Sequence, residues 1–375
     1  DFFLSKQSYF LSESGLEDII YKLKTAYPVA ASNTITLNGN SATTTVATGG
    51  YNIKTITSLG DVTLRQRKNT ITLSPGDGIS FNYGIQSGIG GFIMNNNSGV
   101  NGNVYSNGNI SGSGGVYING TAVSAGASGI IDEVSVGSNG KGDAWAHTVT
   151  DSSVVGNLYC QTGSGNNKSC NSVQGDPPLT PMPITQEMID QWKSDAELGG
   201  TVAGNLTISS PTSLGPKKIT GDLAINSNLT ITGTLYVVGK ITTGNGVQVS
   251  LDPSYGATGG IIIVDGTVNL SNNAQFSGSG APNTYILLMT TSACPTVGCT
   301  TTNAVEIANN VGAVIVNAQN GTAHLNNNIT LNEIVANKII MDNNVVINYL
   351  SGLASTVFTS GPSGGWSIQS WKEIK

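Results

Sequence analysis

The feature that most constrains this chain is a six-residue repeat in which a glycine is followed, two residues later, by an aliphatic side chain. The triplets Gly102-Asn103-Val104 and Gly108-Asn109-Ile110 follow one another at this spacing. We interpret each unit as a short strand with one inward side chain, then a corner where glycine adopts backbone angles closed to other residues. Such corners wind strands into a coil, so the repeat predicts a β-solenoid. The corner glycines are Gly102, Gly108, Gly114 and Gly120 in a first run and Gly204, Gly221, Gly233 and Gly239 in a second.

Strands rich in Val and Ile continue to about residue 347, but the strict spacing is lost after the second run. Asn pairs recur beside them, and asparagine suits left-handed corners and can stack in ladders along a solenoid. Coils of unequal length favour a right-handed parallel β-helix over the left-handed kind, whose repeat is strictly hexapeptide. The chain has 49 Gly and only 10% charged residues, which also favours many short strands joined by tight turns. A β-sandwich with glycine-rich hairpins is the alternative.

The expected fold class is mainly β, with an N-terminal α-helix, a small β-layer, and a parallel β-helix that carries an inserted disulfide- and helix-containing region. Residues 33–85 alternate in the manner of antiparallel strands. The insertion holds a proline-rich segment at 176–183 and a helix from Thr185 to Gly199, and we expect it to shield exposed strand edges. The expected divisions are the helix at 1–31, a β-rich connecting layer at 32–100, first coils at 101–124, the insertion at 125–200, the main solenoid at 201–359 and a C-terminal tail packing on the core at 360–375.

The first 27 residues have the pattern of an amphipathic helix. Pro28 ends it, because the residue before a proline is displaced from helical geometry. Such a helix can dock on its own domain or bind a partner, and the pattern alone leaves both open. The apolar side is formed by Phe2, Tyr9, Leu16 and Leu23 at intervals of seven, with Ile19, Ile20 and Tyr27 in adjoining positions.

Residues 9–18 of this helix read Tyr-Phe-Leu-Ser-Glu-Ser-Gly-Leu-Glu-Asp. They resemble the Tyr-Phe-x-Ala-Glu-Ala-Gly-x-Glu stretch of type IV minor pilins and pilin-like proteins, with serines at 12 and 14 where that family more often has alanine. Further landmarks, among them Gln191-Trp192-Lys193 and Trp371-Lys372-Glu373, look like a large bacterial pilin-like surface protein with a β-helical head.

The resemblance implies an extracellular, cell-surface filament in which the helices of pilin subunits bundle into a spine and the heads face outward. Family assembly also uses a glutamate near the mature N-terminus, which this sequence does not contain. We expect a hydrophobic segment to precede Asp1 and to provide the chain's only membrane contact. The residues assigned to the assembly helix are Phe2, Phe3, Tyr9, Phe10, Leu16, Ile19, Ile20, Leu23 and Tyr27.

Four cysteines form two close pairs, Cys160 with Cys170 and Cys294 with Cys299. We favour two local disulfides, each closing a short loop and contributing roughly 2–3 kcal/mol on the chain-entropy model. Zinc, the alternative, would want shorter spacing within each pair and thiolates in a reducing compartment. Local disulfides indicate an oxidising, extracytoplasmic location.

The net charge is −6, and the only arginines are Arg65 and Arg67. Basic residues are too sparse for a surface that tracks phosphates, so nucleic acid is not an expected partner. The sequence contains no run of eighteen apolar residues that would span a membrane. Corner oxygens of Asp and Asn could hold Ca²⁺, but no residues are assigned to it and no other cofactor is expected.

Catalysis is not expected, although parallel β-helices often serve as polysaccharide lyases and hydrolases. A glycosidase needs two carboxylates facing one groove, whereas the solenoid carboxylates here lie in different expected coils. We interpret them as corner-capping groups, His147 as a satisfied structural histidine and His324 as a strand residue. The carboxylates are Asp222, Asp252, Asp265, Glu306, Glu333 and Asp342.

The sequence therefore predicts a structural subunit of a type IV pilus-like filament, with the helix in the spine and the solenoid displayed for rigidity and surface attachment. One rival is a glycan-binding adhesin at a filament tip, which would need an aromatic-lined groove. The other rival is a secreted carbohydrate-active β-helix enzyme.

Overall fold

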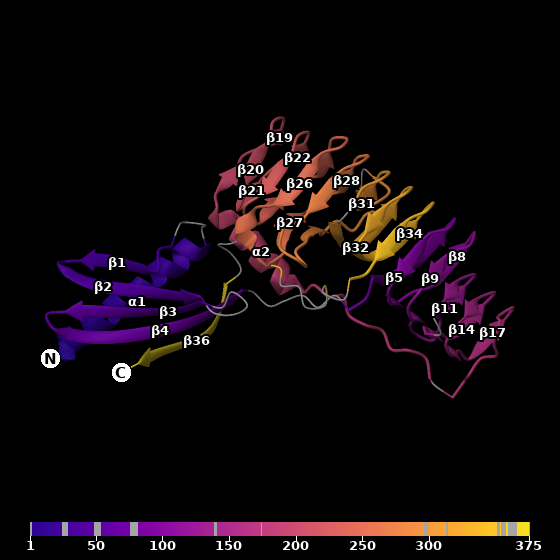
Figure 1. Ribbon diagram of the computed structural model, residues 1–375, viewed down its shortest axis with the longest axis horizontal. Helices are drawn as coiled ribbons and strands as arrows, with labels where there is room; N and C mark the ends of the chain where they lie inside the picture. Colours follow the sequence, from indigo (N-terminus) through magenta and orange to yellow (C-terminus); the bar gives the residue numbers. More distant parts are fainter. Residues whose placement is uncertain are drawn as a thin grey trace.

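The structure is a computed structural model, and it describes residues 2–24, 29–48, 54–75, 82–138, 141–173, 175–295, 299, 301–312, 314–350, 353, 358 and 366–374. A layer made of one helix and an antiparallel sheet lies at one end of the long axis, and a curved solenoid of short parallel strands fills the rest (Figure 1). The mainly β fold class with an N-terminal helix and a parallel β-helix is therefore confirmed.

In the layer, helix α1 (Phe2–Lys24) packs on a five-stranded sheet with the order β1-β2-β3-β4-β36. The last strand comes from the C-terminus and pairs antiparallel with β4, with Trp371 opposite Ile71. The sequence predicts that this tail packs on the core; the structure instead uses it to cover the backbone groups at an open sheet edge. The strands are β1 (Ser32–Leu37), β2 (Asn40–Thr48), β3 (Lys54–Val62), β4 (Arg65–Pro75) and β36 (Trp366–Ile374).

The solenoid strands pair in parallel, coil upon coil, in sheets of 21, six and four strands. Coil length varies, as expected: Ala144 pairs with Leu158, 14 residues later, whereas Val268 pairs with Val305, 37 residues later. Most of the three-residue strands turn two side chains inward, such as Leu223 and Ile225 of one strand, so a continuous column made mainly of Val, Ile and Leu fills the coils from end to end. This column is the core.

The coils do not stack in sequence order. The chain enters the solenoid at β5 and builds coils outward to one end, then restarts at the opposite end and builds back toward the middle (Figure 1). The last long strand, β34, then pairs with β5, placing Ile339 beside Phe92. This β34–β5 seam joins the two runs into one body, so the chain enters and leaves the solenoid at its centre.

The first run forms one arm. Its strands are β5 (Ile85–Asn95), β6 (Gly99–Asn101), β7 (Val104–Ser106), β8 (Ile110–Ser113), β9 (Tyr117–Ile118), β10 (Ala122–Ser124), β11 (Ile130–Asp132), β12 (Ser135–Val136), β13 (Ala144–Trp145), β14 (Thr148–Thr150), β15 (Ser153–Val154), β16 (Leu158–Tyr159) and β17 (Thr162–Ser164).

The second run forms the other arm. Its strands are β18 (Thr201–Val202), β19 (Leu206–Ile208), β20 (Thr212–Leu214), β21 (Lys217–Ile219), β22 (Leu223–Ile225), β23 (Leu229–Ile231), β24 (Leu235–Val237), β25 (Ile241–Thr243), β26 (Gln248–Leu251), β27 (Gly260–Val264), β28 (Val268–Leu270), β29 (Gln275–Ser277), β30 (Ile286–Thr290), β31 (Val305–Ile307), β32 (Val314–Leu325), β33 (Thr330–Leu331), β34 (Glu333–Met341) and β35 (Val346–Asn348). A 3-10 helix, η2 (Pro253–Tyr255), interrupts it.

Two expected boundaries differ from these strands. Residues 85–100, expected in the connecting layer, hold β5 and all but the last residue of β6, and both strands stack in the solenoid. Residues 130–164, expected in the insertion, hold β11 to β17, which also stack there. The physical reason is that a parallel ladder needs only two or three paired residues per coil face, so it tolerates connections of very unequal length between them.

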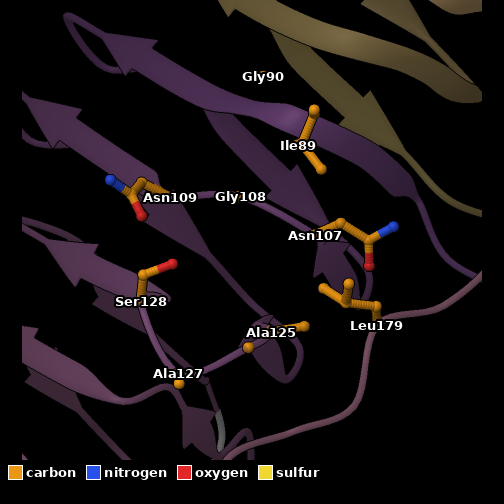
Figure 2. Close-up of a pocket in the computed structure, with 10 residues that line it drawn as sticks. Ile89, Gly90, Asn107, Gly108, Asn109, Ala125, Ala127, Ser128 and Leu179 are labelled. Atoms are coloured by element: carbon orange, nitrogen blue, oxygen red, sulfur yellow. The ribbon is translucent and has the colours of Figure 1, made fainter.

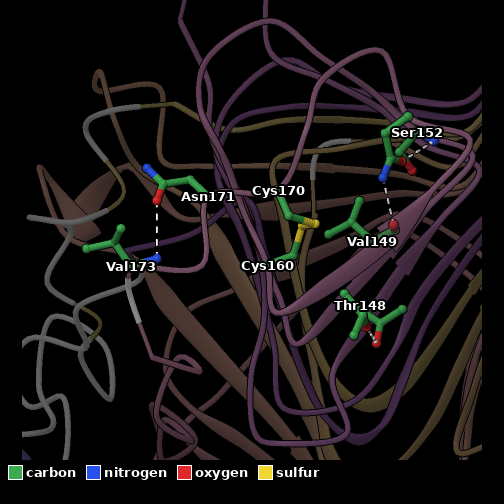
Figure 3. The surroundings of a disulfide bond; sticks show 9 residues. Thr148, Val149, Ser152, Cys160, Cys170, Asn171 and Val173 are labelled. Carbon is green, nitrogen blue, oxygen red and sulfur yellow. Dashed lines mark hydrogen bonds between the residues drawn. A yellow bond between two sulfur atoms is a disulfide. The ribbon is translucent and has the colours of Figure 1, made fainter.

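The remainder of the expected insertion forms two features. The disulfide loop caps the last coil, and the proline-rich segment at 176–183, which we call the strap, runs along the side of the solenoid. The disulfide loop of Cys160 and Cys170 folds over the last coil, near Val149 and Ser152 (Figure 3). There the Asn166 side chain accepts from the Ser152 N–H (2.9 Å) and donates to the Val149 carbonyl (2.7 Å). Asn167 does the same for the N–H and carbonyl of Val154. These amides take the place of a further coil and satisfy an edge that would otherwise be open.

The proline-rich segment then runs back along the side of the solenoid. Tyr105 donates to the Pro178 carbonyl, Gln86 to the Pro181 carbonyl (2.7 Å), and Gln319 to the Ile184 carbonyl (3.0 Å). These contacts come from both runs of coils, so the strap bridges the β34–β5 seam. It leads into helix α2 (Gln186–Leu198), whose N-cap is Thr185 and which packs on β21, β24 and β27.

The corner glycines sit where coils approach one another, but only Gly114 and Gly204 of the eight have a left-handed φ (73° and 77°). At Gly108, for example, a Cβ would lie 2.5 Å from the Ile89 carbonyl oxygen, and at Gly120 it would lie 2.4 Å from that of Gly102. The expectation that these glycines supply unusual backbone angles is therefore wrong for most of them. Glycine is needed there because the neighbouring coil leaves no room for a side chain.

Candidate assembly surface

Helix α1 approaches the sheet through small residues. The Ser8 hydroxyl donates to the Gly60 carbonyl (2.6 Å), and the Ser12 hydroxyl donates to the Ser58 carbonyl (2.9 Å). A Cβ at Gly60 would lie 2.2 Å from the Ser8 carbonyl oxygen, so this contact admits only glycine. Ser12, one of the two serines that replace alanine in the pilin-like stretch, therefore has a defined role in anchoring the helix.

Aliphatic side chains reinforce that contact toward the end of the helix. Leu16 and Ile19 are fully buried, Leu23 nearly so, and all three pack against Ile56, Ile71 and Leu73 of the sheet. Ile20 is partly buried at the edge of this cluster. Leu11, which the predicted stripe omits, is buried with Ala42 and Val62. Tyr27 lies outside the described residues.

The N-terminal half of the predicted stripe does not pack on the sheet. Phe2 is 73% exposed, whereas Leu16 and Leu23, in the same series, are buried. The cause is geometric: a straight α-helix turns a seven-residue repeat by about 20° per repeat, so the stripe leaves the sheet toward its start. Phe2 therefore faces solvent and Tyr9 is only partly buried.

A second row of apolar side chains lies on the side of α1 opposite the sheet. Phe3 is 70% exposed, and Phe10 and Tyr21 are each 60% exposed. At 100° per residue these three positions lie within about 20° of one another around the helix. We call this set the aromatic row. Sequence periodicity missed it because Glu17 and Ser14 interrupt it.

Charged groups flank the aromatic row. Lys22 and Asp18 form an ion pair at 2.6 Å, and the Lys6 ammonium lies 4.4 Å from the centre of the Phe2 ring. A hydrogen bond with Glu13 raises the pKa of the Tyr9 hydroxyl, so this phenol stays neutral. The outer surface of α1 is thus apolar along one line and charged beside it, as in helices that pack together.

The solenoid surface carries a carboxylate–imidazole–carboxylate stack. His324 Nδ1 lies 2.9 Å from Glu306 Oε1, and His324 Nε2 lies 2.9 Å from Asp342 Oδ2. The hydrogen bond with Glu306, supported by Asp342, raises the pKa of the imidazole to about 9. Burial would raise the pKa of the Glu306 carboxyl, but hydrogen bonds from His324, Asn326 and Asn303 outweigh it and lower the pKa.

This stack brings together two carboxylates that the sequence places in separate coils. His324 is a strand residue, as expected, and its two nitrogens engage both carboxylates. None of the three described surface grooves includes any of the three residues. The other histidine, His147, contacts both carboxylate oxygens of Asp176 at 3.1 Å, which fits the interpretation of a satisfied structural residue.

Helix α2 is held to the solenoid through Asp265. Its carboxylate accepts from Lys193 (2.5 Å), Tyr236 (2.6 Å) and Thr291 (2.8 Å). Burial raises the pKa of the Tyr236 hydroxyl, and the hydrogen bond to Asp265 raises it further. Asp265 thus serves as a docking point for α2 rather than as a corner cap.

One open groove of about 560 Å³ lies between solenoid corners and the strap (Figure 2). Ile89 and Leu179 flank it, and the Asn107 side chain is tied to both the N–H and the carbonyl of Thr180. Its lining contains no aromatic and no charged side chain. The most closely stacked aromatic pair among the described residues, Trp145 and Tyr159, lies elsewhere, with ring centres 3.7 Å apart.

Among the carboxylates of the described strands, only Glu333 of β34 is almost fully buried, at 1% exposure. Its Oε2 has no hydrogen-bond partner among the residues that the structure describes. Burial therefore raises the pKa of this carboxyl well above its usual 4.5 and favours its protonated form.

We expect Glu333→Gln to stabilise the protein at pH 8 relative to the wild type and to change stability little at pH 4. Between pH 4.5 and the raised folded pKa the native state keeps a proton that the unfolded chain has lost, so the free energy of unfolding falls as pH rises. Glutamine removes that term. Urea unfolding at the two pH values measures it, with Glu17→Gln on the exposed helix surface as control; equal wild-type and Glu333→Gln profiles across this range would contradict the assignment.

The cysteines pair as predicted, Cys160 with Cys170 and Cys294 with Cys299, and no free cysteine occurs among the described residues. In the described part of the chain, no three His, Cys, Asp or Glu side chains are arranged to hold a metal ion. Neither described α-helix combines the length and apolar character needed to cross a bilayer.

No protein-family model matches the sequence, and no curated protein matches it. Among solved structures, the crystal structure of the competence-associated pilin ComZ from Thermus thermophilus is similar, with a TM-score of 0.31 and 10% sequence identity over 99% of this chain and 97% of that chain. A likeness at this TM-score carries no weight for what this chain does.

Proposed function

We propose that the chain is a non-catalytic structural subunit of an extracellular, type IV pilus-like filament. Helix α1 packs against the helices of neighbouring subunits, and the solenoid is displayed outward as a rigid head for surface attachment. The observation that carries the proposal is the aromatic row, Phe3, Phe10 and Tyr21, on the side of α1 opposite its own sheet.

The aromatic row supports a partner helix for an energetic reason. One face of α1 already anchors the helix to the sheet, whereas the aromatic row lies mostly exposed on the opposite side, outside the clusters that pack on the sheet. Exposed aromatic rings aligned on one surface are typical of protein–protein contacts, where a few such residues supply most of the binding energy. Charged side chains beside the row would set the register of the contact.

Three further observations agree with this function. The stretch from Tyr9 to Asp18, which resembles that of minor pilins, lies on the same helix and includes Phe10 of the aromatic row. Both disulfides are typical of an oxidising, extracytoplasmic environment. The stacked coils, whose backbone groups are satisfied from coil to coil, fit a stiff displayed head.

The double substitution Phe10→Ser with Tyr21→Ser is expected to abolish incorporation into filaments while leaving the monomer folded. Removing two aromatic anchors should weaken helix–helix association on the order of 1,000-fold, because such residues contribute about 2 kcal/mol or more each. Electron microscopy of filaments from cells that express the complete protein measures incorporation. Circular dichroism of the purified chain checks the fold.

Leu179→Ser is the matched control, since Leu179 is also 60% exposed but lies on the strap of the solenoid. It should leave incorporation unchanged. Filaments that form normally with the double variant, or a wild-type chain found only as free monomer, would refute the proposed function.

A further inference from the structure

The free end of the layer gathers apolar and cationic side chains. Helix α1 begins there, the β3–β4 hairpin turns there, and β36 ends there, away from the solenoid (Figure 1). Arg67 connects these elements: its Nε donates to the Ser5 hydroxyl (2.8 Å) and its Nη1 lies 2.8 Å from Glu373 Oε1. We call Phe2, Phe3, Lys6, Leu64, Arg65, Arg67 and Lys68 the basic tip.

Leu64 is the outlier of the basic tip. It is 91% exposed, the most exposed large hydrophobic residue described, and it has a φ of 66°. Its turn partner Thr63 has a φ of 48°. A two-residue hairpin with both residues in the left-handed region strongly prefers Asn-Gly, and a leucine there gains neither turn stability nor packing. Because Leu64 suits neither the left-handed turn nor exposure to solvent, its side chain points to a contact outside the chain.

Cations surround these apolar groups. Arg65, Arg67 and Leu64 line an open groove of about 340 Å³ with Ser5, and Lys68 lines the adjoining groove on the other side of Arg67. Lys6 lies over the ring of Phe2. Arg65 and Arg67 are the only arginines of the chain, so the guanidinium groups are confined to this end.

The layer carries a net positive charge and the solenoid carries a net negative charge. Residues 1–75 and 366–375 contain nine Lys and Arg against six Asp and Glu, a net charge of +3. The remaining residues contain seven against sixteen, a net charge of −9. A negatively charged surface would therefore attract the layer and repel the solenoid, which orients the molecule with the basic tip inward.

We propose that the basic tip docks on the headgroup region of an anionic phospholipid surface. Leu64, Phe2 and Phe3 enter the boundary between headgroups and acyl chains, and Arg65, Arg67, Lys6 and Lys68 pair with lipid phosphates. This contact is additional to the expected hydrophobic segment preceding Asp1. It uses a different surface from the aromatic row, apart from Phe3, and does not require filament assembly.

A bilayer fits the basic tip better than a folded partner does. The apolar side chains protrude separately, with Phe2 73% and Leu64 91% exposed, and do not close into one apolar cleft. A protein interface needs close shape complementarity around its anchors, whereas a fluid interface accepts separate protrusions flanked by cations.

Vesicle flotation with the purified full chain tests the proposal. We expect binding to vesicles of phosphatidylcholine with about 30% phosphatidylglycerol, little binding to pure phosphatidylcholine, and loss of binding in 1 M salt, where the screening length falls to about 3 Å. Leu64→Asn should reduce the partition coefficient about ten-fold, since it removes one buried aliphatic group. Asparagine suits the left-handed turn, so this variant should fold at least as well as the wild type.

Arg65→Ser should reduce partitioning about five-fold at low salt, the contribution of roughly one cation near an anionic surface. Leu179→Ser is the control and should bind as the wild type does. Phe10→Ser with Tyr21→Ser should also bind vesicles normally, which separates this proposal from the filament proposal. Absence of binding to the anionic vesicles at low salt overturns the proposal. So does a Leu64→Asn variant that binds vesicles normally but self-associates less in sedimentation, because that assigns the tip to a second copy of the chain.

Discussion

Replacing Phe92 with alanine is expected to lower the free energy of unfolding by about 3–5 kcal/mol, the usual cost of removing a buried phenylalanine. Phe92 is 1% exposed and is among the largest fully buried side chains of the solenoid. It pairs with Ile339 on one side and Ile110 on the other, so its ring fills the core where the two arms meet. The cavity would lie at the β34–β5 seam, where the two arms are joined by strand pairing and side-chain packing and not by a continuous stretch of chain.

Urea unfolding measures the loss of stability, and hydrogen exchange locates it. Amides of β5 and β34 should lose protection before those of the outer coils, because the seam is the interface that the substitution weakens. Phe10→Ala is the matched control: Phe10 is 60% exposed, so its removal should change the stability of the monomer by less than about 0.5 kcal/mol. Uniform loss of protection along the whole solenoid would contradict a weak seam.

Stability should decline as pH rises from about 6.5 through 9, and this decline should disappear in His324→Gln. The folded pKa of His324, about 9, lies above the usual value of 6.5 for histidine, so its contribution is complete below pH 6.5 and is lost as pH rises through the folded pKa. The lowered pKa of Glu306 acts in the opposite direction: its contribution is present above pH 4.5 and is lost on acidification. The stack therefore stabilises most between about pH 4.5 and 6.5.

The size of this effect is on the order of 1–3 kcal/mol, after allowing for solvent screening of carboxylates that are about a third exposed. Urea unfolding of the wild type and His324→Gln at pH 6 and pH 10 gives the difference, and nuclear magnetic resonance of the imidazole gives its titration midpoint. A midpoint near 6.5, or an equal loss of stability with pH in both proteins, would show that the stack is not charged.

The solenoid could be predicted because its repeat is local. Each coil needs a glycine where the next coil passes and an aliphatic side chain two residues later, and both are visible in the sequence. The same triplet also occurs at Gly142-Asp143-Ala144 and Gly156-Asn157-Leu158, in the region expected as an insertion. Because the loops between these triplets differ in length, the sequence does not show that they continue the solenoid, although the structure stacks them in register.

The order of the coils could not be predicted. Pairing of β34 with β5 joins residues about 250 positions apart, and no local pattern marks those strands as neighbours. The same holds for β36, whose pairing with β4 depends on the edge that the rest of the layer leaves open.

Half of the candidate site could be read from the sequence. Periodicity found Leu16, Ile19 and Leu23, which pack on the sheet, because burial imposes the period. It did not find the role of Phe3, Phe10 and Tyr21 as a separate row, because these residues do not face the sheet whose burial imposes the period. The basic tip was also missed, since it forms only when the start of α1, a hairpin and the C-terminal strand meet.

The central attachment of the solenoid has a mechanical consequence. The chain joins the coils at Gly84, whose N–H donates to the Asn103 carbonyl, and departs at Tyr349, whose N–H donates to the Asn101 carbonyl. A force transmitted through the layer would therefore act on the central coils around the β34–β5 seam. Hydrogen bonds between paired strands hold these coils together, and the strap bridges them. The outer coils of both arms would carry no tension, and either arm could lengthen by added coils without changing how the head is suspended.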